Sequence, residues 1–339
     1  MDSAPQRAGG DTAPRHDASS ITGRAPTGGK RVGDRPPRPF LKWAGGKRQL
    51  LPELRRYYPD RFESYHEPFV GSGAVFFDLV GRGALRPRRV RLTDVNPDLI
   101  GCWRQLRDNR EAVIAHLQKL ASERVEAPEE HYYRVRDRFN PARSAMLDRG
   151  RPQAELYTAE LAAMLIYLNR TGFNGLFRVN SRGLFNVPRG RYKNPRICDE
   201  RNLRRASEAL SSLRAEVDYT PYDAVLDVAG PRDFVYLDPP YAPLSATASF
   251  TSYTAGRFDE SDQRRLQEVV IRLAKRRCHV VLSNSTAPEI RELYDDNAAA
   301  RRAGIVAHRV PARRAINSNA ARRGTIEEYV ITNVRQRAT

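Results

Sequence analysis

The sequence predicts an α/β fold in which strands and helices alternate around an open sheet. Three stretches predict it: residues 65–77 have the order of a strand, a glycine turn and a helix, residues 90–94 form a strand ending in Asp94, and residues 233–237 form another strand, followed by Asp238. Ligands of open α/β sheets bind beyond the carboxyl ends of the strands, so both acids are candidate site residues.

The composition favours a polyanionic partner. The chain of 339 residues has 58 Lys and Arg against 40 Asp and Glu, a net charge of +18, although a basic, Arg-rich proteome is an alternative explanation. No apolar run approaches the roughly 20 residues of a membrane span or forms a signal peptide, so we expect a cytoplasmic protein with no membrane partner. Cys102, Cys198 and Cys278 lack metal-ligand spacing, which predicts reduced thiols and no metal site.

The chain begins with a stretch that has no hydrophobic periodicity. Residues 1–38 are rich in Gly, Ala, Pro, Asp and Arg, which predicts a disordered basic tail. Such a tail either anchors the protein weakly on DNA through phosphate contacts or is an inert extension.

A glycine turn followed by a lysine comes next. Gly45 and Gly46 precede Lys47, and the apolar residues after it recur at helical spacing, which predicts a helix over residues 49–58. The N–H groups at the start of a helix suit an anion, although the Walker spacing of a P-loop is missing. Trp43 is suited to stacking on a base. Alternatively, Trp43 is a core residue and Lys47 a solvated residue of the first helical turn.

The glycine turn of residues 67–73 and Asp94 together predict a nucleoside site. Glycines such as Gly71 let a ligand approach the backbone closely. About 20 residues further on, the carboxylate of Asp94 is placed to accept hydrogen bonds from ribose hydroxyls, as in Rossmann-type sites. Either half alone is compatible with a purely structural role.

Residues 98–170 are predicted to be mostly helical, with a break near Asn109 and an apolar helix over residues 159–168. The composition then changes: over residues 169–193, Gly, Asn, Arg and aromatic residues alternate. Apolar wedges can hold open the gap left by an extruded base, Arg pairs bidentately with guanine, and Asn does so with adenine. This stretch therefore predicts a DNA-reading segment, and the alternative is a basic, solvated hairpin loop.

The remainder returns to alternating elements. We expect helices over residues 200–213, 258–277 and 288–294, and strands over residues 215–219, 279–284, 305–310 and 326–332. The small-residue loop of residues 242–251 is suited to closing over a substrate.

The run Asp238-Pro239-Pro240-Tyr241 carries the predicted chemistry. Proline has no backbone N–H, so two prolines end the strand and leave the carbonyls of Asp238 and Pro239 as free acceptors. A carboxylate, free carbonyls and the ring of Tyr241 suit a planar group that carries an amine. The alternative is a proline turn in which Asp238 is a cap or turn residue.

These motifs, in this order, resemble those of Dam-type, D12-class DNA adenine N6-methyltransferases. The resemblance rests on residues 40–47, 67–73, Asp94, 169–193 and 238–248, and it spans nearly all of residues 39–333. It implies a Rossmann-like, seven-stranded methyltransferase sheet with an inserted, mainly helical DNA-recognition domain.

The resemblance also implies a division of the chain and a cofactor. Residues 39–110 and 200–335 would form the catalytic domain, which binds S-adenosylmethionine, and residues 111–199 the target-recognition insertion. The cofactor would be contacted or lined by Trp43, Lys47, Glu67, Phe69, Gly71, Asp94 and Asp238. Asp238, Pro239 and Tyr241 would hold the target adenine, flipped out of the duplex for direct methyl transfer.

By the same resemblance the partner is double-stranded DNA, bound by a monomer that associates with the nucleoid through DNA. The DNA-contacting positions would be Lys42, Phe173, Asn174, Leu176, Arg178, Asn180, Pro188 and Tyr192. The best-known members of the family methylate GATC, and we expect that site here. Phe173 and Val179 depart from the family pattern, which has Tyr at both positions.

Other functions remain open at this point. A cytosine N4-methyltransferase would use the same acceptors but more often has Ser-Pro-Pro-Tyr, and a protein or RNA methyltransferase more often has Asn-Pro-Pro-Tyr. A non-catalytic DNA-binding regulator would not need the acceptor run that begins at Asp238.

Overall fold

The computed structural model describes residues 35–43, 45–86, 88–147, 156–243, 258–313 and 325–336. The chain divides into two units, Met1–Arg35 and Pro36–Thr339, and apart from Arg35 the described residues all belong to the second. Most of the predicted tail, and residues 244–251 of the predicted closing loop, lie outside the described residues. No helix in the described ranges is long and apolar enough to span a membrane.

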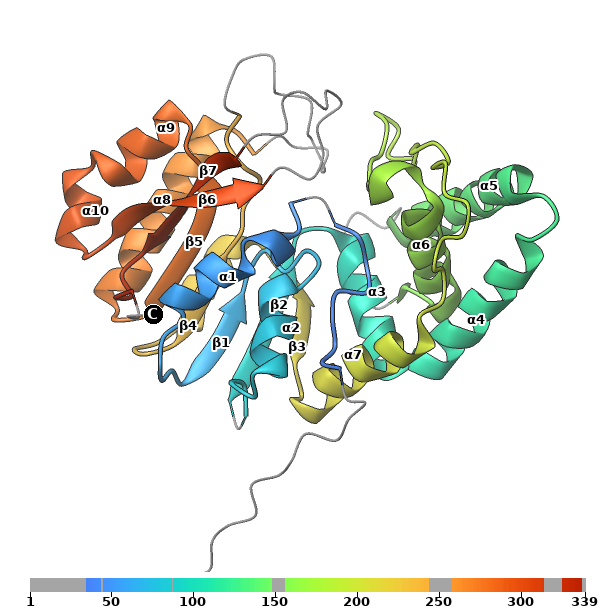
Figure 1. Ribbon diagram of the computed structural model, residues 1–339, viewed down its shortest axis with the longest axis horizontal. Helices are drawn as coiled ribbons and strands as arrows, with labels where there is room; N and C mark the ends of the chain where they lie inside the picture. Colours follow the sequence, from blue (N-terminus) through green and yellow to red (C-terminus); the bar gives the residue numbers. More distant parts are fainter. Residues whose placement is uncertain are drawn as a thin grey trace, which may run out of the picture. The chain divides into compact units, whose positions relative to one another are not determined.

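Seven strands form one sheet in the order β3-β2-β1-β4-β5-β7-β6 (Figure 1). The strands are β1 (Ser64–Glu67), β2 (Arg89–Asp94), β3 (Glu216–Tyr219), β4 (Phe234–Leu237), β5 (His279–Ser285), β6 (Val306–Arg313) and β7 (Thr325–Thr332). β1 to β5 pair in parallel, and β7 is antiparallel to both of its neighbours. The predicted seven-stranded α/β sheet is confirmed.

Both faces of the sheet are buried. All four residues of β4 are buried, and they alternate between two hydrophobic clusters. Phe234 and Tyr236 belong to one cluster, and Val235 and Leu237 to the other. Side chains of a strand point alternately to opposite faces, so helices cover the sheet on both sides, as parallel sheets require.

The helices agree largely with the predicted ranges. They include α2 (Ala74–Gly81), α3 (Pro97–Asp108), α4 (Arg110–Glu123), α5 (Pro128–Leu147), α6 (Ala159–Thr171), α7 (Glu200–Ser212), α8 (Glu260–Lys275) and α10 (Ala298–Arg302). The predicted break at Asn109 separates α3 from α4. Helices α4 and α5 both pack on α6 to one side of the sheet (green in Figure 1), and α6 is almost entirely buried.

Two predicted helices are wrong in form. Residues 49–58 do not form one helix: the segment consists of η1 (Lys47–Gln49), α1 (Leu51–Leu54) and η2 (Arg55–Tyr57). Pro52 lies in the first turn of α1 and cannot donate the N–H that would join α1 to the turn before it. The helix expected at 288–294 is likewise split, into α9 (Pro288–Ile290) and the π-turn η7 (Arg291–Asp295).

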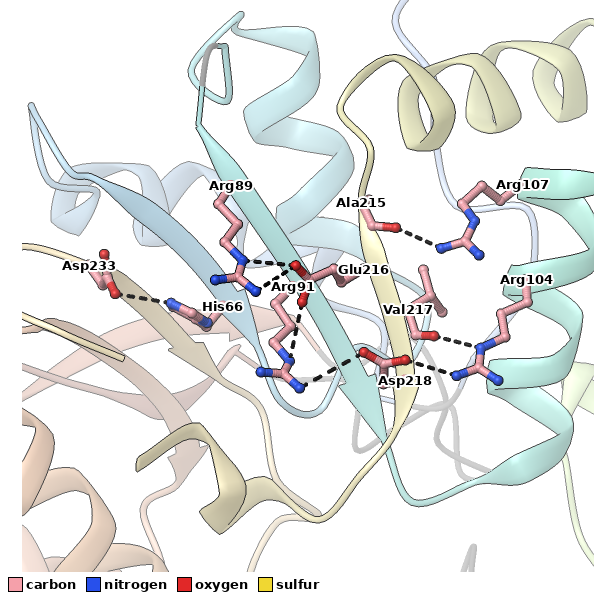
Figure 2. Close-up of polar contacts among 10 residues, drawn as sticks. All are labelled: His66, Arg89, Arg91, Arg104, Arg107, Ala215, Glu216, Val217, Asp218 and Asp233. Carbon is pink, nitrogen blue, oxygen red and sulfur yellow. Dashed lines mark hydrogen bonds and ion pairs between the residues drawn. The ribbon is translucent and has the colours of Figure 1, made fainter. Parts of the chain in front are cut away.

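Side chains of α3 protect the edge strand β3 (Figure 2). Arg104 donates to the carbonyl of Val217 at 2.7 Å, and Arg107 donates to the carbonyl of Ala215 at 2.8 Å. These carbonyls lie on the side of β3 that has no neighbouring strand. Side chains of the helix thus form hydrogen bonds with backbone carbonyls that would otherwise be free to pair with a strand of another chain.

Candidate active site

Three acids lie at one edge of the sheet, where its strand order reverses. Glu67 is the last residue of β1, Asp94 is the last residue of β2, and Asp238 directly follows β4. β1 is parallel to β2 and to β4, so the three carboxyl ends meet at the switch point between β1 and β4. The predicted strand-end positions of Asp94 and Asp238 are confirmed.

The carboxylate of Asp238 is held from one side. Its Oδ1 accepts hydrogen bonds from Lys47 Nζ at 2.8 Å and from Ser283 Oγ at 2.9 Å. Ser283 is fully buried and has a single hydroxyl hydrogen, so Tyr236, whose hydroxyl lies 3.1 Å from Ser283 Oγ, is the donor in that contact. Burial raises the pKa of Asp238, and the charge and hydrogen bond of Lys47 oppose this.

The ammonium of Lys47 lies between the carboxylate and the ring that were predicted to hold an amine. Its Nζ is 2.7 Å from the carbonyl oxygen of Gly45 and 4.3 Å from the ring centroid of Tyr241. The side chain is only 8% exposed, so the alternative that Lys47 is a solvated residue of a helical turn is wrong. The ion pair with Asp238 was not predicted. It leaves 19% of the Asp238 side chain exposed.

Buried amides fix the loop after Asp238. Gln263 Nε2 of α8 donates to the carbonyl of Pro240 at 3.0 Å, and Asn284 Nδ2 of β5 donates to Gln263 Oε1 at 3.0 Å. The Oδ1 of Asn284 accepts from the N–H of Ala242 at 3.3 Å. Among the described residues nothing donates to the carbonyl of Pro239, in agreement with the prediction from the paired prolines.

Tyr241 is oriented by a strand on the far side of the loop. Its hydroxyl donates to Glu328 Oε2 of β7 at 2.9 Å. Burial raises the pKa of Tyr241 far above its ordinary value, so the hydroxyl stays neutral and a donor. The ring plane is therefore fixed next to Asp238.

Glu67 is a buried acid that keeps its proton near neutral pH. Its Oε2 accepts hydrogen bonds from Tyr65 Oη at 2.7 Å and from the N–H of Phe76 at 3.2 Å. Burial raises the pKa of Glu67 to about 8, and these hydrogen bonds only partly offset the effect. Asp238 and Glu67 therefore do not both carry a negative charge at pH 7.

Asp94 joins the glycine turn to the start of α3. Its Oδ2 accepts from the N–H of Gly71 at 3.2 Å, and its Oδ1 accepts from the N–H of Asn96 at 3.0 Å. Burial raises the pKa of Asp94 to about 6. The turn needs glycine: Gly73 has a φ of +66°, and a Cβ there would lie 2.4 Å from the Trp103 ring.

Aromatic residues line the same edge. Trp43 is half-buried and stacks on Phe177, with ring centroids 5.6 Å apart. A Cβ on Gly71 would lie 3.2 Å from Trp43 Cδ1, so the indole lies directly on the glycine turn. Phe69 stacks on Tyr222 at 5.2 Å. The structure thus brings Trp43 and Gly71 together, whereas Phe69 belongs to a separate aromatic group.

Apart from Lys42, which lies just before the Gly45–Lys47 turn, the predicted DNA-contacting residues lie in the segment that follows α6. Those with exposed side chains are Phe173 (49% exposed), Asn174, Arg178, Asn180 and Pro188, and those that are half-buried are Lys42, Leu176 and Tyr192. Arg178 Nε donates to Asn186 Oδ1 at 2.8 Å, so the guanidinium is held against its own hairpin. The Lys42 ammonium lies 4.2 Å from the ring centroid of Tyr192.

One buried amide joins the glycine-lysine segment to this loop. Asn169 Oδ1 accepts from the N–H of Lys42 at 2.7 Å, and Asn169 Nδ2 donates to the carbonyls of Lys42 at 2.6 Å and Gly175 at 2.8 Å. Gly175 has a φ of +64°, and a Cβ there would lie 2.6 Å from the side chain of Lys42. The two segments that carry predicted DNA contacts are therefore fixed to each other.

Sequence reasoning missed the residues that support these groups. Ser283, Asn284, Gln263 and Asn169 are all buried polar side chains, and buried polar groups are expected to be hydrogen-bonded. A weak signal existed for two of them, because the apolar strand at residues 279–282 ends in Ser283 and Asn284. Gln263 looked like an ordinary polar residue of an amphipathic helix.

Comparison with known proteins places this site in a family. The sequence model of the D12 class of N6 adenine-specific DNA methyltransferases matches residues 43–310. The type II methyltransferase M1.LlaDCHI of Lactococcus lactis subsp. cremoris is 38% identical over 296 residues, which cover 87% of this chain and 95% of that protein. The type II methyltransferase M.MjaIII of Methanocaldococcus jannaschii is 37% identical over 308 residues, 87% and 99% of the two chains. The DNA adenine methylase of Escherichia coli K12 is 35% identical over 293 residues, 86% and 94% of the two chains.

Proposed function

This chain belongs to the D12 class of N6 adenine-specific DNA methyltransferases, and from that premise we propose which groups perform the reaction, on which DNA and with which methyl donor. The chain transfers a methyl group from S-adenosylmethionine to N6 of an adenine flipped out of a duplex GATC site. One observation carries the proposal: the Asp238 carboxylate and the ring of Tyr241 flank a position that the positively charged nitrogen of Lys47 already occupies.

The described residues fit this cofactor. Asp94 and Asp238 place two carboxylates at one sheet edge, where one suits ribose hydroxyls and the other attracts a cation. Gly71 keeps the backbone next to Trp43 open to a flat ligand. When bound, S-adenosylmethionine supplies an electrophilic methyl group on a sulfonium cation. Trp43, Lys47, Asp94 and Asp238 would hold it, with Glu67, Phe69 and Gly71 lining the site.

Asp238 and Pro239 make the target nitrogen reactive. The lone pair of the adenine amino group is delocalised into the ring, so the nitrogen is a poor nucleophile. Accepting its two N–H groups at the carboxylate and the carbonyl favours a pyramidal nitrogen and stabilises positive charge as it develops. The methylated nitrogen then loses one proton, which the carboxylate or water accepts. Tyr241 stacks on the base, and alignment supplies much of the rate gain.

The Lys47 side chain would have two positions in this site, one before and one after the target base enters. In the present arrangement its ammonium forms a hydrogen bond with Asp238 and faces the ring of Tyr241. An adenine cannot occupy the same position, so Lys47 leaves as the base enters. The carboxylate of the cofactor is the anion that it would then meet.

The DNA sequence is recognised by a part of the chain that does not belong to the sheet. Residues 39–110 and 200–335 form the catalytic domain, and residues 111–199 form the recognition insertion, whose hairpin carries Arg178. Arg178 suits bidentate pairing with guanine, while Lys42, Asn174, Asn180 and Tyr192 suit contacts to base edges or phosphates. Leu176 and Phe173 are apolar residues that suit the gap that a flipped base leaves, and the N–H of Phe173 donates to the carbonyl of the exposed Pro188 at 2.8 Å. The enzyme acts as a monomer on double-stranded DNA.

Labelled methyl transfer to defined duplexes tests the proposal. Purified protein is incubated with S-adenosylmethionine carrying a labelled methyl group and a duplex with one GATC site, and the DNA is digested to nucleosides. We expect all label in N6-methyladenine, and almost none with GTTC in place of GATC. Label in N4-methylcytosine would support the cytosine alternative, and tight DNA binding without any label would support the regulator.

A further inference from the structure

The segment that carries Arg178 and Asn180 is a short antiparallel hairpin, residues 178–187, called here the recognition hairpin. Val179 is bridged to Phe185. Asn180 N donates to the carbonyl of Leu184 at 2.9 Å, and Asn186 N donates to the carbonyl of Arg178 at 3.1 Å. Residues 184 and 186 thus direct their backbone groups to the partner strand, so Phe185 and Val187 direct theirs to the opposite edge. Gly183 lies in the turn: its N–H donates to the carbonyl of Asn180 at 2.9 Å, and its carbonyl accepts from a side chain of α5.

Side chains of helix α5 form hydrogen bonds with the backbone groups along that opposite edge. Tyr132 Oη donates to the carbonyl of Val187 at 2.8 Å, and Arg143 Nη1 donates to the carbonyl of Gly183. Asn140 pairs with both backbone groups of Phe185: its Oδ1 accepts from the N–H at 2.8 Å, and its Nδ2 donates to the carbonyl at 3.2 Å.

The spacing of these contacts is regular. Strand positions two apart face one edge, and helix positions three, four or eight apart face one side of a helix. Tyr132, Asn140 and Arg143 therefore form one row on α5 that takes the place of a third strand. Arg104 and Arg107 of α3 occupy the free edge of β3 in the same way (Figure 2).

Arg143 also ties the hairpin to the half of the molecule that carries Asp94. Its Nε donates to Asp98 Oδ2 at 2.7 Å, and the two side chains are 8% and 0% exposed. Asp98 lies in the first turn of α3, four residues after Asp94. The other oxygen of Asp98 has no hydrogen-bond partner among the described residues, so Arg143 alone compensates the buried charge.

We propose that Tyr132, Asn140 and Arg143 are specificity-determining positioning residues: they set the register and orientation of the recognition hairpin, and thereby which base pairs Arg178 can read. This inference rests on the proposed role of the hairpin in DNA recognition. None of the three needs to touch DNA.

The physical reason is the strictness of base reading. A one-residue slip of a strand moves every side chain to the opposite face, and bidentate pairing of Arg with guanine tolerates little displacement. A hairpin of two short strands is marginally stable on its own. With its edge bonds removed, the hairpin samples other positions, and recognition of the correct site weakens more than binding of DNA phosphates.

Specificity ratios test the proposal. The value of kcat/KM is measured for a GATC duplex and for duplexes with one base pair of the site changed, in the full chain and in Tyr132→Phe and Asn140→Ala. We expect the ratio of correct to altered site to fall about fivefold in Tyr132→Phe and about tenfold in Asn140→Ala, with cofactor Kd unchanged. Tyr132→Phe removes one hydroxyl and leaves packing intact, so it serves even where Asn140→Ala does not fold.

Two further variants make the outcomes distinct. Tyr133→Phe is the matched control: the Tyr133 ring packs on Tyr132 and Arg136 and is kept by the substitution, and its hydroxyl forms no hydrogen bond with the described residues of the hairpin. Its ratio should equal that of the unsubstituted chain. Equal loss of activity on all duplexes in both α5 variants, with the ratio unchanged, would overturn the inference. An unchanged ratio in Arg178→Lys would instead overturn the recognition role of the hairpin, on which this inference rests, while the proposed methyl transfer at Asp238 would stand on its own test.

Discussion

The protonated state of Glu67 leads to a stability prediction with a definite sign. A glutamate in an unfolded chain has a pKa of 4.5, whereas burial raises the pKa of folded Glu67 to about 8. Below pH 4.5 both states are protonated. Between pH 4.5 and 8 the unfolded state releases its proton and the folded state does not, so stability falls as pH rises and levels off above pH 8.

The size of the effect follows from the same two values. Keeping the proton from pH 4.5 up to about pH 8 lowers the free energy of unfolding by about 5 kcal/mol over that interval. Glu67→Gln removes the titration while its amide oxygen can still accept from Tyr65 and Phe76. The variant should therefore match the unsubstituted chain at low pH and become increasingly more stable than it towards pH 8.

Urea unfolding at about pH 5 and pH 8.5 measures this difference. We expect the gain of Glu67→Gln over the unsubstituted chain to grow by several kcal/mol between the two pH values. Glu63→Gln is the control, because that carboxylate is 60% exposed on the segment leading to β1, and its pH dependence should parallel the unsubstituted chain. Parallel curves for Glu67→Gln as well would show that the buried carboxyl is ionised in the folded state, and the reasoning would be refuted.

Three further predictions concern groups around Asp238 and Lys42. Ser283→Ala removes a hydrogen bond that lowers the pKa of Asp238, so the acidic limb of the kcat/KM profile should move to higher pH. A limb that stays in place contradicts the role of the hydroxyl. Lys47→Met removes the ammonium with which an entering base would compete. In the absence of cofactor, a duplex with 2-aminopurine at the target position should therefore fluoresce more strongly with this variant than with the unsubstituted chain, because more of the base is flipped out. Equal fluorescence with both proteins would count against that competition. Asn169→Asp replaces the amide N–H groups that donate to the carbonyls of Lys42 and Gly175 by a carboxylate oxygen that cannot donate. The free energy of unfolding in urea titrations should fall by about 3 kcal/mol, whereas a fall of less than about 1 kcal/mol would mean that the hydrogen bonds of Asn169 to Lys42 contribute little.

Local pattern was enough to place the acids of the site. Asp94 ends β2 and Asp238 directly follows β4, and strand ends in a parallel sheet meet at one edge, so their positions follow from periodicity and topology. The glycine turn was also predicted from local sequence, because glycine adopts backbone conformations that other residues rarely adopt. Gly73 has such a conformation in the structure, with a φ of +66°.

The supporting contacts could not be predicted in the same way. Lys47 and Asp238 are far apart in the chain, and no local pattern states which of many lysines lies against a given acid. Asn140 looked like any polar residue of an amphipathic helix, although it pairs with the backbone of Phe185. Such partnerships depend on how elements pack, whereas periodicity reports only which face of an element is buried.

The central claim is that Asp238 accepts the amino group that is methylated, and a single-turnover measurement tests it most directly. Asp238→Ala is mixed with a GATC duplex at saturating S-adenosylmethionine, and methyl transfer and duplex binding are measured on the same samples. The account predicts a transfer rate at least about a hundredfold lower, with duplex binding within a few fold of the unsubstituted protein. Transfer at near-normal rate by this variant would contradict the account.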